Sequence, residues 1–187
     1  MTLMDIPSDN DQLHLLIDNI GLVLQVAQIY HLVVLEENIT TNALIEILLK
    51  LPDLVSIKIH SLSLEHSQTP YLNEEIQMRL STTSKITSVI LEEMNHIHDI
   101  DFLIELCPQI NYLQLYWTEV ITDIQAFVEK IIMKISESNQ YLQYLSFGAP
   151  EVDDQAVEKL ERMRNLHIPL FNYSVKRVDD EIVMQWK

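Results

Sequence analysis

The sequence predicts an α/β solenoid, in which similar strand–helix units stack side by side. An apolar triplet with the spacing L-x-x-L-x-L starts at six places in the 187-residue chain, and these starts lie 25, 32, 24, 32 and 24 residues apart. After most triplets the apolar spacing changes from a period of two to a period of about 3.6, as expected where a strand gives way to a helix. A recurring length near 24 residues, twice extended by about eight, is typical of repeated units with insertions.

The triplets are the predicted strands. Seventeen of their eighteen positions are apolar, whereas a chain that is 48% apolar would give about nine by chance. In chain order they are Ile29/Leu32/Val34, Leu54/Ile57/Ile59, Ile86/Val89/Leu91, Ile110/Leu113/Leu115, Leu142/Leu145/Phe147 and Leu166/Pro169/Phe171. A three-layer α/β domain would also alternate strands and helices, but strands buried on both faces are continuously apolar. The alternation within these segments therefore predicts a sheet with one face open to solvent.

Amphipathic helices are predicted between the strands, because apolar residues recur there on one side of a helix. These stripes are Leu44/Ile47/Leu48, Phe102/Leu103/Leu106, Ile124/Phe127/Val128/Ile131/Ile132/Ile135 and Val157/Leu160/Met163. Residues that favour the cap of a first helical turn stand before them, namely Thr40 or Thr41, Asp99, Thr122 or Asp123, and Asp153 or Asp154.

The chain divides into three predicted segments. Residues 1–28 are an N-terminal cap or a degenerate first repeat, residues 29–172 hold the repeats, and residues 173–187 are a C-terminal cap. Residues 174–186 predict two short strands around an acidic turn. Caps are expected because each unit of a solenoid buries its apolar face only against its neighbours.

The composition excludes several classes of ligand. With 28 acidic and 12 basic residues the chain carries a formal charge of −16, so it lacks the basic face that holds the phosphates of nucleic acids. It has two glycines, where average usage would give about 13. Neither a GxGxxG nor a GxxxxGK[ST] phosphate loop occurs. We therefore expect neither a nucleic-acid partner nor a cofactor.

The sequence also bears on the compartment. Its one cysteine, Cys107, cannot form an intrachain disulfide, and its first basic residue is Lys50. Secretory and mitochondrial leaders need early positive charge, and the most apolar stretch, residues 20–35, is too short and too polar to cross a bilayer. These features predict an intracellular protein, cytoplasmic or nuclear, with no membrane partner.

Short motifs recur at the junctions between the predicted elements. Residues 39–41 are Ile-Thr-Thr, 121–123 are Ile-Thr-Asp, 152–154 are Val-Asp-Asp and 106–110 are Leu-Cys-Pro-Gln-Ile. They resemble the leucine-rich repeats of the F-box and ribonuclease-inhibitor-like class, in which a strand, I-T-D, a helix and L-x-x-C-P-x-L follow in order. The resemblance implies about six repeats, with a parallel sheet on the concave face and helices on the convex face. It also implies a substrate-recognition or adaptor role, with ubiquitin-ligase subunits as partners if a flanking F-box exists; none is visible in this chain.

Two groups of residues could carry chemistry. His96, His98 and Asp99 are close together in the sequence, but they lie in a predicted strand-to-helix loop where Asp99 would cap the helix. We expect no metal site there, and a hydrolase that uses this loop is the less favoured alternative. Cys107 lies at a predicted helix end with no basic partner to activate it, so we expect a structural role.

The candidate binding residues lie between the buried triplet positions, on the face that strand alternation leaves open. Only two of the eighteen residues on this face are charged, which favours protein binding over solvation. The partner-binding candidates are His31, Val33, Lys58, His60, Ile90, Glu92, Tyr112, Gln114, Tyr116, Tyr144, Ser146, Ile168 and Leu170. The sequence thus predicts a non-catalytic protein-interaction module with its tyrosines as anchors. The alternative is an acidic, inhibitor-like binder of basic proteins.

Overall fold

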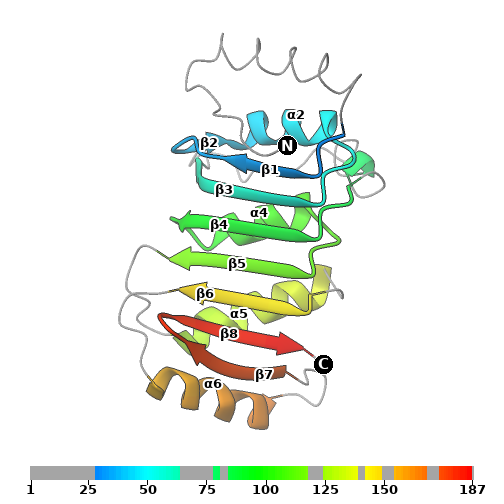
Figure 1. The fold of residues 1–187 in the computed structure, drawn as a ribbon. Coiled ribbons are helices and arrows are strands. Elements are labelled where there is room, and N and C mark those ends of the chain that lie inside the picture. The colour runs from blue at the N-terminus through cyan, green and yellow to red at the C-terminus, as the bar shows by residue number, and fades with distance from the viewer. Residues whose placement is uncertain are drawn as a thin grey trace.

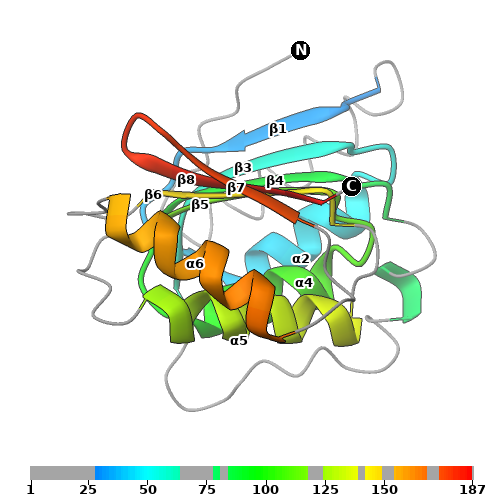
Figure 2. The same cartoon turned by 90° about the horizontal axis from the view of Figure 1, so that it is seen from below.

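The computed structural model describes residues 28–63, 78–80, 84–117, 124–138, 142–148, 154–167 and 173–186. In this part of the chain eight strands form one sheet, and Figures 1 and 2 show helices covering one of its faces. Apart from its last residue, the predicted N-terminal cap, residues 1–28, lies outside the described part.

Five parallel strands make up the larger part of the sheet. They are β1 (His31–Val34), β3 (Ser56–Ser63), β4 (Ser88–Met94), β5 (Tyr112–Trp117) and β6 (Tyr144–Gly148), side by side in that order. The short strand β2 (Ile39–Thr40) pairs in parallel with the far end of β3. Equivalent triplet residues pair across the sheet in one row, formed by Leu32, Ile57, Val89, Leu113 and Leu145. The first five predicted strands are therefore confirmed.

The predicted fold class, a leucine-rich-repeat solenoid with an entirely parallel sheet, is wrong. The sheet is mixed, because the chain ends in an antiparallel hairpin of β7 (Tyr173–Val178) and β8 (Glu181–Trp186), and β8 pairs antiparallel with β6. The two strands expected around an acidic turn are thus present, and they place β7 at the sheet edge.

The sixth predicted strand is also wrong. Leu166 belongs to helix α6 (Asp154–His167), and residues 168–172 lie outside the described part of the chain. The reason is that an L-x-x-L spacing fits both element types, since residues three apart share one side of a helix. Pro169 also lacks the N–H that a strand inside a sheet must donate.

The helices α2 (Thr41–Lys50), α4 (His98–Leu106), α5 (Ile124–Ser138) and α6 lie on the same face of the sheet (Figure 2). Thr40 caps α2 as predicted, since its hydroxyl oxygen accepts the N–H of Ala43 at 3.3 Å. The predicted cap at Asp99 is wrong, because α4 has Ile97 at its N-cap and no side-chain hydrogen bond there. The predicted caps Thr122, Asp123 and Asp153 lie outside the described residues.

The core lies between the sheet and these helices. All fifteen apolar residues of the first five triplets are buried there. Phe127 of α5 packs edge-on against Phe147 of β6 and Trp117 of β5, with ring centroids 5.6 and 5.2 Å away. Edge-to-face contacts of this kind add to the stabilisation from burial of the rings. Among the described residues the helices therefore cover one face of the sheet, and none of them lies on the other face.

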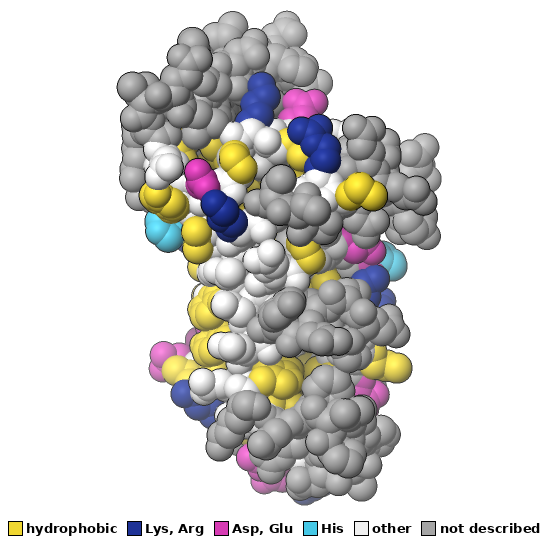
Figure 3. Space-filling view, turned by 90° about the vertical axis from the view of Figure 1, so that its right-hand side faces the viewer, with side chains coloured by type: hydrophobic (Ala, Val, Ile, Leu, Met, Phe, Trp, Pro, Cys, Tyr) yellow, Lys and Arg dark blue, Asp and Glu magenta, His cyan; other side chains and the backbone are white. Residues whose placement is uncertain are grey.

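The parallel strands begin at a ladder of backbone hydrogen bonds. The carbonyl of Tyr30 accepts the N–H groups of Val55 and Ser56 at 2.8 and 3.1 Å, and the carbonyls of Val55, Thr87 and Asn111 each accept two N–H groups in the same way. Figure 3 shows this end of the molecule, where white atoms (backbone and other side chains) and yellow hydrophobic side chains are seen in the middle of the view. The ladder holds neighbouring strands in register from their first residues.

Candidate binding surface on the helix-free face

The structure brings eleven of the thirteen partner-binding candidates together on the sheet face opposite the helices, here called the helix-free face. One row across the strands consists of Val33, Lys58, Ile90, Gln114 and Ser146. Tyr112 and Tyr144 pair in the row that also contains His31, and His60, Glu92 and Tyr116 lie two residues further along their strands. Ile168 and Leu170 lie outside the described residues.

Strand β8 is the sixth strand of this face. The sequence pattern predicted other residues in its place. Glu181, Val183 and Gln185 stand directly opposite Gly148, Ser146 and Tyr144, and directly opposed residues of an antiparallel pair share a face. The acidic turn in the sequence indicated the hairpin of β7 and β8, but nothing in the sequence indicated that β8 would pair with β6. Glu181 is therefore the functional candidate that sequence reasoning missed.

A hydrogen-bond network surrounds the Glu181 carboxylate. The hydroxyl of Tyr116 donates to it at 2.7 Å, the amide nitrogen of Gln114 lies 3.1 and 3.3 Å from its two oxygens, and the hydroxyl of Ser146 donates to it as well. Gln114 also donates to the Tyr116 oxygen at 2.7 Å and accepts from the Tyr112 hydroxyl at 2.9 Å. The hydroxyls of Tyr112 and Tyr116 are thus engaged inside the protein, so their rings remain as the surface for a partner.

The network raises the pKa of Tyr116 to about 12, mainly because its hydroxyl donates to Glu181 and secondarily because the phenol is partly buried. Ionisation would place a phenolate against a carboxylate, and two like charges at hydrogen-bond distance repel. Tyr116 therefore stays neutral over the physiological range.

Gly148 makes room for the Tyr116 ring. A Cβ atom at position 148 would lie 2.9 Å from Cδ1 of that ring, closer than carbon atoms pack. The backbone of β6 thus lets the phenol lie across the neighbouring strand and reach Glu181.

Tyr112 and Tyr144 form a stacked pair on adjacent strands. Their ring centroids are 4.6 Å apart and their planes differ by 7°. Burial is the main cause that raises the pKa of Tyr112, followed by the neighbouring Tyr144. The pair presents a rigid, part-exposed aromatic surface, because each ring limits the rotamers of the other.

A charged group adjoins the tyrosines on β3 and β4. Lys58 pairs with Glu92, and Nδ1 of His60 lies 3.1 Å from the second oxygen of that carboxylate. Nε2 of His60 lies 3.7 Å from the carboxylate of Glu93. The hydrogen bond from Lys58 is the main cause that lowers the pKa of Glu92, so Glu92 is ionised at neutral pH.

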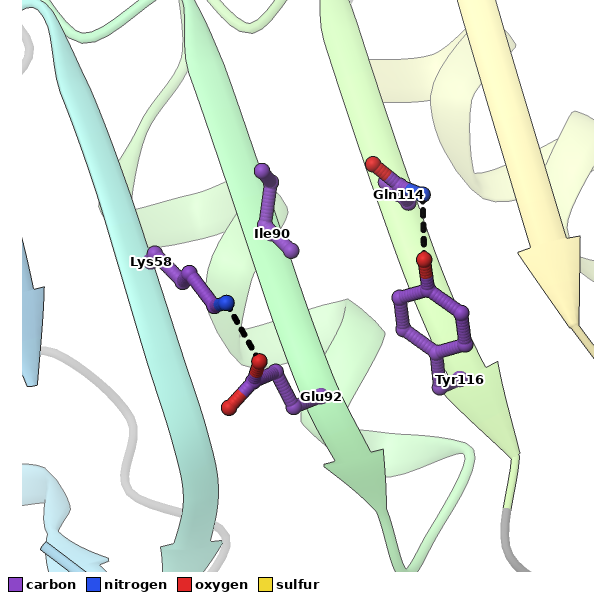
Figure 4. Close-up of a pocket in the computed structure, with 5 residues that line it drawn as sticks. All are labelled: Lys58, Ile90, Glu92, Gln114 and Tyr116. Atoms are coloured by element: carbon purple, nitrogen blue, oxygen red, sulfur yellow. Dashed lines mark hydrogen bonds and ion pairs between the residues drawn. The ribbon is translucent and has the colours of Figure 1, made fainter. Parts of the chain in front are cut away.

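A shallow depression of about 380 Å³ opens between these two groups, lined by Lys58, Ile90, Glu92, Gln114 and Tyr116. Figure 4 shows Lys58 and Glu92 pointing toward one another and Gln114 bonded to Tyr116 along β5. Its lining combines an ion pair, an aliphatic side chain and an aromatic ring. These groups suit the binding of a side chain from another molecule.

The loop before α4 that contains His96 is held by hydrogen bonds to the carboxylate of Asp99. Asp99 is fully buried, and its Oδ2 accepts the backbone N–H groups of Asn95 and His96 at 3.1 and 3.0 Å. His98 instead faces Asp101, at 3.2 Å. Burial raises the pKa of Asp99. Among the described residues no group of three or more His, Cys, Asp or Glu side chains could hold a metal ion.

Cys107 is fully buried, and burial raises the pKa of its thiol to about 12. A thiol is nucleophilic as the thiolate, and burial keeps Cys107 in the thiol form at neutral pH. Its position matches the structural role expected from the sequence.

The chain matches no protein-family model and no curated protein sequence. In the described part of the chain, no helix is both long enough and apolar enough to cross a membrane.

Proposed function

We propose that this protein is a non-catalytic protein-binding module that holds its partner on the helix-free face. The observation that carries the proposal is the locked aromatic surface of Tyr112, Tyr116 and Tyr144. Two rings are stacked, and the third is tied to Glu181 on another strand. Aromatic side chains that are already fixed bury a large area at little entropic cost, which is typical of the anchors of protein interfaces.

The small number of charged side chains on the face supports a protein partner. In a chain of charge −16, the face carries Lys58 and Glu92, and β8 and β7 add Glu181 and Lys176 by their register. The formal charges of these four residues sum to zero, because two are lysines and two are glutamates. Charge depletion of this kind is expected where water is excluded at an interface.

The test uses three forms of the purified chain as bait in extract. They are the wild type, the double variant Tyr112→Ala/Tyr144→Ala and the control Met133→Ala, whose side chain is exposed on α5. Proteins captured by the wild type and the control but lost with the double variant are candidates. Hydrogen exchange on a purified complex must then show protection on β5 and β6. Protection confined to the helices would refute the proposal, as would equal capture by all three forms.

A further inference from the structure

In the depression between Lys58 and Tyr116, the hydrogen bonds within the described part of the protein leave some acceptor sites open to a ligand. Both amide hydrogens of Gln114 are engaged, with Tyr116 and Glu181, and the Tyr116 hydrogen goes to Glu181. Among the described residues, Lys58 bonds one oxygen of Glu92 and His60 lies at hydrogen-bond distance from the other. A carboxylate oxygen has two acceptor sites, so Glu92 can still accept one donor at each oxygen.

The local charge favours a cation in this depression. Three carboxylates lie in or beside it, because Glu92 is part of the lining, Glu93 faces His60 and Glu181 bonds Tyr116. In the same set of residues the basic groups are the Lys58 ammonium in the lining and the His60 imidazole, which faces Glu92 and Glu93. A concave site with an excess of one sign attracts the opposite charge, and the −16 of the whole chain acts in the same direction.

The walls of the depression fit a long side chain with a flat cationic end. Ile90 on β4 offers an aliphatic surface opposite Gln114, and the Tyr116 ring lies further along β5 in the same lining. A guanidinium stacks on aromatic rings and donates two parallel hydrogen bonds to one carboxylate, whereas an ammonium does neither as well.

We propose that this depression binds an arginine side chain of the partner protein, with Glu92 as its counter-charge and Ile90 and Tyr116 as its apolar walls. The proposal rests on the proposed function, since it specifies one contact of that interface. Lys58 then acts as a competing internal cation, which the arginine partly displaces from Glu92.

The test is a titration of the isotope-labelled chain with N-acetyl-arginine amide, followed by backbone amide chemical shifts. Shifts are expected at the residues that line the depression. Glu92→Gln should weaken binding roughly fivefold, and Lys58→Gln should strengthen it roughly twofold, because the competitor is removed. Glu46→Gln is the matched control, since it removes the same charge from an exposed position on α2 and should leave binding unchanged.

Several outcomes would overturn the proposal. They are tighter binding of N-acetyl-glutamate amide or N-acetyl-lysine amide at these residues, weaker arginine binding after Lys58→Gln, or equal effects of the Glu92 and Glu46 variants. Absence of any shift would overturn it too. The small probe separates this proposal from the proposed function. If N-acetyl-arginine amide does not bind while the tyrosine double variant still loses a partner, the proposed interface is supported and the arginine site is refuted. If N-acetyl-arginine amide binds while the tyrosine double variant keeps every partner, the arginine site is supported and the tyrosine interface is refuted.

Discussion

Replacing Tyr116 by phenylalanine removes one oxygen that joins β5 to β8 while it leaves the ring in place. The lost hydroxyl donates to Glu181 and accepts from Gln114, both at 2.7 Å. A hydrogen bond to a charged group contributes about 1.5 to 3 kcal/mol when buried. Because this site is partly exposed, we expect the free energy of unfolding to fall by about 1.5 kcal/mol.

Urea unfolding measures the loss, and its pH dependence tests the cause. The folded-state pKa of Tyr116 is raised to about 12 from an ordinary value of 10.0. Its contribution to stability is therefore complete below about pH 10 and is lost as the pH rises toward about 12. The difference between wild type and Tyr116→Phe should therefore shrink as the pH rises from about 10 toward about 12.

Two further variants identify the partner of the hydroxyl. Tyr30→Phe is the control, because its hydroxyl donates to nearby Gln28 at an exposed position, and should cost less than about 0.5 kcal/mol. A double-mutant cycle of Tyr116→Phe with Glu181→Gln should give a coupling of about 1 kcal/mol. A loss no larger than that of Tyr30→Phe, a coupling near zero, or a loss that is constant with pH would refute this explanation.

Three further predictions concern buried groups. Gly148→Ala should lower the free energy of unfolding by about 1 kcal/mol, because the new Cβ displaces the Tyr116 ring; the loss should vanish when Tyr116 is also alanine, and a persistent loss would show another cause. Asp99→Ala should cost about 2 kcal/mol in urea unfolding, because two backbone N–H groups lose their acceptor. Asp99→Asn keeps an acceptor and should cost less than half as much; equal losses would contradict this account. Cys107 should react with a thiol reagent only after unfolding in guanidinium, and rapid labelling of the native chain would show that it is accessible.

The parallel part of the sheet could be predicted because its signal is local. Strand alternation sends successive side chains to opposite faces, so the triplets identified both the buried rows and the row of Lys58, Ile90 and Gln114. The same local reasoning found the Thr40 cap, whose oxygen reaches the helix it precedes. At Asp99 the residue type was suited to capping, but its carboxylate accepts from the loop that precedes α4.

The last part of the sheet could not be predicted in the same way. A triplet starting at Leu166 suits a strand or a helix, and α6 extends past that position. The pairing of β8 with β6 joins residues more than 30 positions apart, such as Gly148 and Glu181, and no local pattern specifies such a pairing. The tyrosines were therefore found as candidates, whereas the carboxylate that orders them was not.

The backbone ladder at the strand starts has a consequence for how the chain could accept new sequence. Main-chain groups of Tyr30, Val55, Thr87 and Asn111 align each strand with the next one, whatever side chains are present. The 32-residue spacing between the starts at Leu54 and Ile86 and the 24-residue spacing between those at Ile86 and Ile110 consequently give the same alignment of the first strand residues. A foreign peptide placed in a connection that leaves the far ends of these strands would lie at the Tyr116 end of β5, away from the ladder that aligns the strands. The protein is thus suited to loop grafting, because the length of a connection can change while the backbone ladder keeps the strands aligned.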